Sequence, residues 1–119
     1  MNLESPIPVR AEQIVRLAQL SIVSEREGDL HALDLTGEID LANAADVDAE
    51  LRRIEATDVE MILVALSGVS FIDSTGLKVV IGAAARARDT GRLLLERPSA
   101  AVLRLLQIAG VRDLLPLAV

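Results

Sequence analysis

Asp73, Ser74, Thr75 and Gly76 place a carboxylate, two hydroxyls and a glycine side by side in the sequence. An apolar run precedes them and apolar residues at helical spacing follow them, which predicts the first turn of a helix at the edge of a sheet. Backbone N–H groups are unpaired in such a turn, and the helix dipole favours negative charge there. Taken alone, the motif is most simply a helix cap made by Asp73. The Ser74 hydroxyl is not needed for that cap, so it could accept a phosphoryl group or anchor a partner. Gly76 is expected to leave its approach open.

The residues required for several kinds of catalysis are missing. The glycines lack the spacing of a phosphate-binding loop or a dinucleotide-binding turn, and Ser74 lacks the preceding glycine of a nucleophile elbow. His31, the only histidine, falls among alternating apolar residues and is typical of a buried sheet position. Asp46, Asp48 and Glu50 are expected on a solvated helix surface, because residues two apart on a helix point to different faces. We therefore expect no enzyme, no cofactor and no metal site.

Composition excludes further classes of protein. The chain has 119 residues, of which 51% are hydrophobic and only 1% aromatic, so we expect one domain with an aliphatic core. A net charge of -6 and the near absence of aromatic side chains argue against a nucleic-acid partner. There is no cysteine, no apolar run long enough to cross a bilayer, and no signal-peptide pattern at the start. These features predict a cytoplasmic protein without a membrane partner.

Hydrophobic periodicity and turn residues divide the chain into strands and helices. The expected strands are 20–25, 30–35, 61–66 and 93–95, with an edge strand at 114–117. The expected helices are 44–56, a second that begins at Ser74 and ends before Gly91, and 99–109. Ser99 is a candidate N-cap of the last helix and Gly110 its end. Residues 11–19 show weak helical spacing. We expect an N-terminal extension over 1–18 and a single α/β domain over 19–119.

Three segments in the right order resemble one known family. Phe-Ile-Asp-Ser-Thr-Gly-Leu at 71–77 resembles the signature of the STAS domain, as carried by bacterial anti-sigma factor antagonists. Gly-Glu-Ile-Asp at 37–40 resembles the family's loop between a strand and its first helix, and residues 92–117 resemble its last strand and third helix. The resemblance implies a mixed β-sheet of about four to five strands packed against three or more α-helices.

The resemblance also implies a regulatory switch. In the family, an anti-sigma factor that resembles a histidine kinase phosphorylates the serine of this motif, and a PP2C-type phosphatase removes the phosphate. The unphosphorylated antagonist binds the anti-sigma factor and thereby releases a sigma factor. Carried over by position, Ser74 is the phosphoacceptor. The implied partner-binding residues are Glu38, Asp40, Asp73, Ser74, Thr75, Gly76 and Lys78, of which Lys78 stands where the family usually has a small residue.

Other functions remain open at this stage. The same fold occurs as a non-switching subunit of transport or stress-signalling complexes. A small nucleotide-binding or nucleotide-hydrolysing enzyme is a further alternative, disfavoured by the missing phosphate loop and base. Leu103 and Leu106 on the third expected helix could also support a weak homodimer.

Overall fold

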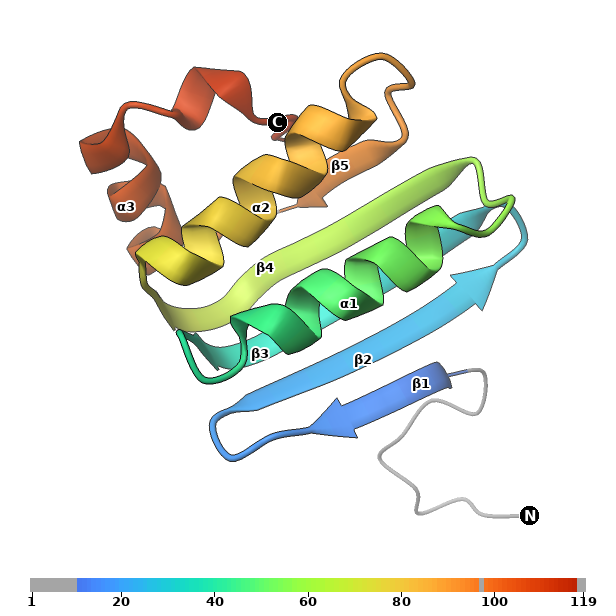
Figure 1. Ribbon diagram of the computed structural model, residues 1–119, viewed down its shortest axis with the longest axis horizontal. Helices are drawn as coiled ribbons and strands as arrows, with labels where there is room; N and C mark the ends of the chain where they lie inside the picture. The colour runs from blue at the N-terminus through green and yellow to red at the C-terminus, as the bar shows by residue number, and fades with distance from the viewer. Residues whose placement is uncertain (1–10, 97, 118–119) are drawn as a thin grey trace.

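A five-stranded mixed sheet with three helices on one face forms the structure, a computed structural model that describes residues 11–96 and 98–117 (Figure 1). The strands lie in the order β1-β2-β3-β4-β5. Their bounds are β1 Ala11–Arg16, β2 Leu20–Glu27, β3 Leu30–Ile39, β4 Met61–Ile72 and β5 Leu93–Glu96. The helices are α1 Ala44–Glu55, α2 Ser74–Ala87 and α3 Ala100–Ala109, followed by a 3-10 turn η1 at Arg112–Leu114. This architecture confirms the expected fold class.

The core lies between the sheet and the helices because burial alternates along the strands. Leu33 and Leu35 on β3 are buried, whereas Asp34 and Thr36, which alternate with them, are exposed, as the two-residue period of a strand requires. Each helix turns its apolar face toward the sheet and adds residues to the same cluster. These residues include Val47, Leu51, Ile54, Leu77, Val80, Val102 and Leu106. The core is therefore aliphatic, as expected from the composition.

The parallel pair β3 and β4 determines where the turn at 73–76 lies. Strand β4 continues to Ile72, six residues beyond the expected end at Leu66, because the segment after Ser67 stays paired with Thr36 to Ile39 of β3. Ile39 and Ile72 are register partners, so both strands end together. The residues that follow each strand therefore lie at the same edge of the sheet.

Residues 11–16 form a strand, so the weak helical spacing at 11–19 was misleading. Strand β1 runs antiparallel to β2, with Ile14 opposite Val23 and Arg16 opposite Ser21. The outer edge of β2 has unpaired N–H and C=O groups, with which residues 11–16 form hydrogen bonds as a strand. A short helix in their place would leave that edge unpaired. Residues 1–10 of the expected extension lie outside the described residues.

The expected helix caps are confirmed, and the tail differs from the prediction. Asp73 caps α2 by accepting from the Gly76 N–H, and Ser99 caps α3 by accepting from the Val102 N–H. Gly110 ends α3 in the left-handed conformation, which glycine adopts without strain. The tail forms η1 and a single bridge between Leu95 and Leu117 in place of an edge strand.

Two side chains expected at the surface point inward. Glu50 is buried beneath α1, where it accepts hydrogen bonds from the Ser24 hydroxyl (2.7 Å) and the Arg53 guanidinium (2.8 Å). Leu106 is also buried, so it cannot contribute to an exposed α3 stripe.

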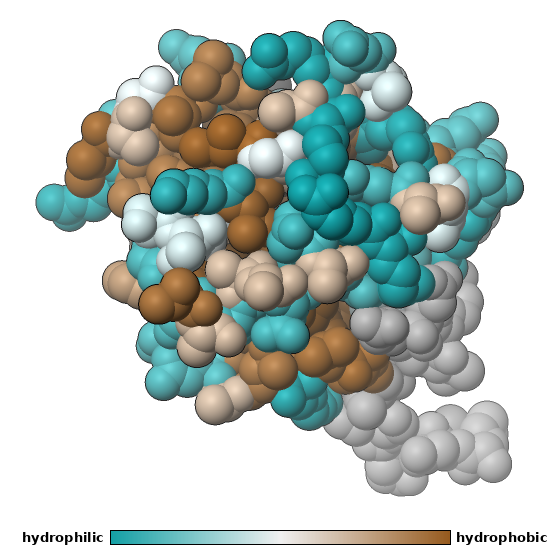
Figure 2. All heavy atoms as spheres, viewed as in Figure 1, coloured by the Kyte–Doolittle hydropathy of each residue, from teal (hydrophilic) through white to brown (hydrophobic). Residues whose placement is uncertain are grey.

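Figure 2 shows apolar residues gathered around α3, at the upper left of the view, where Ile108 is exposed. No helix in the described part of the chain is long and apolar enough to span a membrane.

Candidate functional site

The turn at 73–76 and the loop that joins β3 to α1 lie side by side at the carboxyl edge of the sheet. The Asp73 N–H donates to the Ile39 carbonyl oxygen (3.1 Å), which continues the pairing of β3 and β4 by one step. In open sheets, residues that follow parallel strands gather at this edge and commonly form binding sites. The structure thus brings Glu38 and Asp40 to the same sheet edge as Asp73 and Ser74, the grouping that the family resemblance implied.

Asp73 holds this edge together through three hydrogen bonds. Its Oδ1 accepts from the Thr75 hydroxyl (2.6 Å) and from the Gly76 N–H (3.0 Å), and its Oδ2 accepts from the Leu41 N–H (3.1 Å). The Thr75 hydroxyl, followed by the Gly76 and Leu41 N–H groups, lowers the pKa of Asp73 below its usual value, because each donor stabilises the ionised carboxylate. Asp73 is therefore a charged anchor at neutral pH.

Ser74 is the free hydroxyl of the motif. It is the first residue of α2, its side chain is exposed, and its hydroxyl makes no hydrogen bond within the described part of the structure. Thr75 is half-buried and its hydroxyl is held by Asp73. Only Ser74 therefore combines exposure with an uncommitted oxygen, in the field of a helix N-terminus.

Gly76 serves internal packing, which corrects the expectation that it opens the approach to Ser74. The residue is buried, and a Cβ built on it would lie 2.7 Å from Cγ2 of Ile39 and 2.8 Å from Cγ1 of Ile72. Both distances are well below van der Waals contact. The missing side chain lets the first turn of α2 sit directly on the ends of β3 and β4, and so fixes the position of Ser74.

The loop between β3 and α1 is fixed by Asn43, which the sequence reasoning did not single out. Its Oδ1 accepts from the Asp40 N–H (3.0 Å) and its Nδ2 donates to the Glu38 carbonyl oxygen (2.8 Å), and the residue is only 5% exposed. The Asp40 carboxylate in turn accepts from the Ala42 N–H (3.0 Å). An Asp followed three residues later by Asn is a turn-forming pattern that could have indicated this loop.

The surface around Ser74 carries unpaired charge and exposed apolar side chains. Within the described residues, Glu38, Asp40 and Lys78 form no ion pair. Lys78 is exposed four residues after Ser74, so both lie on one face of α2. Leu41 is 77% exposed and Phe71 49%, although both are large and apolar. A hollow of about 280 Å³ beside the loop is lined by Leu17, Ala18, Gln19, Asp40, Ala42 and Asn43.

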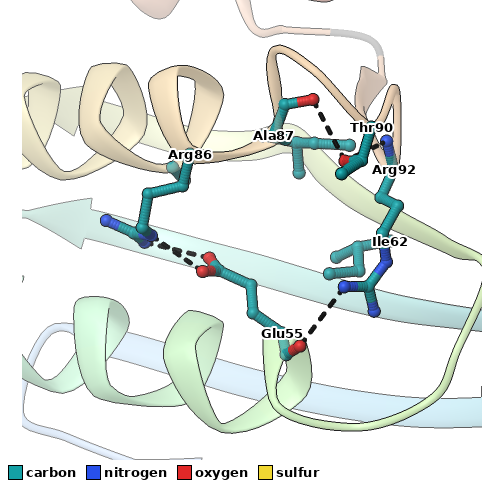
Figure 3. Close-up of a pocket in the computed structure, with 8 residues that line it drawn as sticks. Glu55, Ile62, Arg86, Ala87, Thr90 and Arg92 are labelled. Carbon is teal, nitrogen blue, oxygen red and sulfur yellow. Dashed lines mark hydrogen bonds and ion pairs between the residues drawn. The ribbon is translucent and has the colours of Figure 1, made fainter.

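A second cavity lies at the far end of α2, and the charged side chains that line it bind to other parts of the protein (Figure 3). Its volume is about 190 Å³. Arg86 on its rim binds the Glu55 carboxylate through two nitrogens at 2.7 and 2.9 Å. Arg92 donates to the carbonyl oxygens of Glu55, Thr57 and Val59 at the end of α1 and just beyond it. Both guanidinium groups already bind protein oxygens, so the residues around this cavity serve to connect α1 and α2. The candidate site therefore remains the sheet edge at Ser74.

Known proteins resemble the chain over most of its length. A protein-family model described as the STAS domain matches residues 21–118. The chain is 30% identical over 97 residues to an anti-sigma-B factor antagonist of Bacillus subtilis (strain 168), covering 81% of this chain and 87% of that protein.

Solved structures show the same architecture. An anti-sigma factor antagonist from Mycobacterium paratuberculosis superposes with a TM-score of 0.76 at 19% identity, over 87% of this chain and 89% of the other, and so shows the shared fold. The anti-sigma factor antagonist SpoIIAA in its unphosphorylated form superposes with a TM-score of 0.63 at 25% identity, over 82% of this chain and 88% of the other.

Proposed function

The chain belongs to the STAS domain family, and we propose that it is an anti-sigma factor antagonist switched by phosphorylation of Ser74. The observation that carries the proposal is the free, exposed Ser74 hydroxyl at the start of α2, beside a carboxylate whose oxygens are occupied by Thr75, Gly76 and Leu41. The names of the relatives support the class of function. The unphosphorylated form binds an anti-sigma factor and so frees a sigma factor.

The chemical step takes place on the antagonist but is catalysed by its partner. The Ser74 oxygen attacks the γ-phosphorus of ATP, the bond to the bridging oxygen breaks, and ADP leaves. Asp73 is a poor acceptor for the serine proton, because hydrogen bonds keep its pKa low. The general base therefore belongs to the anti-sigma factor, which acts as the serine kinase. A PP2C-type phosphatase hydrolyses the phosphoserine and restores the binding form. The antagonist is the substrate of both reactions and no enzyme.

Charge at the interface makes the switch effective. A phosphate on Ser74 carries about -1.5 to -2 charges at neutral pH and must be desolvated against a surface shaped for a hydroxyl. Losing ~3 kcal/mol of binding free energy there lowers the affinity by about two orders of magnitude. Within the antagonist, repulsion from Asp73 costs roughly 1–3 kcal/mol, and the N-terminus of α2 returns about 0.3–1, up to ~2, kcal/mol, so the two effects nearly cancel. The fold therefore persists while the partner is released. Lys78, on the same face of α2, can pair with the phosphate and so alter how strongly phosphorylation weakens binding.

Capture and mass spectrometry test this function. The purified protein is incubated with Mg-ATP and a lysate of the source organism, and its peptides are analysed for phosphate. We expect phosphate on Ser74, none in Ser74→Ala, and capture of an ATP-binding anti-sigma factor by Ser74→Ala but not by Ser74→Asp.

Ser70→Ala is the matched control, because Ser70 is an exposed serine four residues away on β4. This variant should keep both phosphate and capture. Phosphate found only at other residues would contradict the switch. Equal capture by the alanine and aspartate variants would indicate a non-switching subunit of a larger complex.

A further inference from the structure

Leu41 is the most exposed large apolar side chain that the structure describes near the switch, at 77%. It lies in the loop between β3 and α1 and makes no contribution to the core cluster. Single exposed apolar residues are common and need no explanation. Leu41 differs because its backbone is held in place by a residue from a distant part of the chain.

That residue is Asp73, whose two oxygens serve different segments. Oδ1 caps α2, and Oδ2 accepts from the Leu41 N–H at 3.1 Å across a sequence separation of 32 residues. Asn43 fixes the other end of the same loop through Asp40 and Glu38. The loop is thus tied on both sides, and its position is coupled to the turn that carries Ser74.

The surroundings of Leu41 indicate the chemistry of what binds there. Glu38 and Asp40, just before it in the chain, carry negative charges that no cation neutralises within the described residues. The hollow beside Asp40 also has apolar walls from Leu17 and Ala42. A matching surface presents an apolar pocket with a cationic rim, since buried apolar anchors surrounded by complementary charge are typical of specific interfaces.

We propose that Leu41 is an anchor residue for the anti-sigma factor, and that Asp73 is a positioning residue that acts through the Leu41 N–H. This inference rests on the proposed function and adds an apolar anchor, Leu41, to the polar residues that the family resemblance implied for the contact surface. Binding then requires both a neutral Ser74 and a correctly held Leu41, and the Asp73 side chain bonds to both segments.

A double-mutant cycle with Asp73→Asn and Leu41→Ala tests the coupling. Asparagine keeps one oxygen, and is as good an N-cap as aspartate, but its amide nitrogen cannot accept from the Leu41 N–H. The probe is the recombinant anti-sigma factor of the source organism, and the dissociation constant is measured by calorimetry. We expect each single variant to bind about 10- to 30-fold more weakly, as for an interface anchor, and the double variant to bind no more weakly than the weaker single variant.

Two further measurements separate this role from a general loss of structure. Ile108→Ala removes a similarly exposed apolar side chain (73%) from α3 and should leave the affinity unchanged. Amide exchange of Leu41 should accelerate in Asp73→Asn while the amides of β3 and β4 keep their protection. Asp73→Ser, which also caps the helix but is too short to reach Leu41, should reproduce both effects if Asp73→Asn is poorly folded.

The outcomes distinguish the two proposals. If the losses of the two single variants multiply in the double variant, or if Leu41→Ala binds normally, the coupling through Leu41 is wrong while the anti-sigma factor antagonist function stands. If neither the wild type nor Ser74→Ala binds the anti-sigma factor, the proposed function fails and this inference fails with it.

Discussion

Replacing Gly76 with alanine tests why the switch turn contains a glycine. The new methyl group would lie 2.7 Å from Ile39 and 2.8 Å from Ile72, so the start of α2 or the ends of two core strands must shift. Overpacking of this kind costs about 1–3 kcal/mol, and the better helix propensity of alanine returns at most about 1 kcal/mol. We expect Gly76→Ala to lower the free energy of unfolding by roughly 0–2 kcal/mol.

Gly82 provides a control within the same helix. A Cβ at Gly82 meets only the flexible end of Arg86, at 3.4 Å, so Gly82→Ala should stabilise the protein by up to about 1 kcal/mol. Urea unfolding followed by circular dichroism measures both variants, and the two should differ by roughly 1–3 kcal/mol. If Gly76→Ala is as stable as Gly82→Ala and loses only partner binding, the packing argument is refuted and Gly76 keeps the approach to Ser74 open instead.

Three further predictions concern the polar contacts. Hydrogen bonding to Arg53 lowers the pKa of Glu50. The stability advantage of the wild type over Glu50→Gln should therefore be present at neutral pH and disappear as the pH falls through that lowered pKa, and a constant difference in urea unfolding between pH 3 and 7 would be inconsistent with this. Arg92→Leu removes a charged donor from three carbonyl oxygens near the end of α1 and should cost about 2–3 kcal/mol of unfolding free energy, measured in the same way. Phosphorylation of Ser74 should raise the pKa of Asp73, observed by NMR titration, and an unchanged pKa would place the phosphate away from that carboxylate.

Local signals were sufficient where a structure depends on neighbours in the chain. Asp73, Ser99 and Gly110 were recognised as helix ends from their types and positions, because capping involves backbone groups only a few residues away. The family resemblance of residues 71–77 pointed to Ser74 in the same way. The end of β4 was misjudged by six residues, because only pairing with β3 carries the strand on to Ile72.

Side-chain direction across the helices was harder to predict. Glu50 was expected in solvent, since charged residues on helices usually are, but Ser24 and Arg53 stabilise it in the interior. Residues 11–16 likewise had ambiguous spacing, and the free edge of β2 turned them into a strand. In each case the deciding partner comes from another element of the fold.

The sequence by itself determined the α/β class, the aliphatic core and the position of the capped turn at 73–76, because these follow from periodicity, composition and a contiguous motif. Only the tertiary structure decided what that turn is connected to. The common end of β3 and β4 brings Leu41 to Asp73 across 32 residues, and the close packing on Ile39 explains the glycine at 76. The physical reason is that hydrogen bonds and steric contacts between distant segments depend on strand register, which no local pattern encodes.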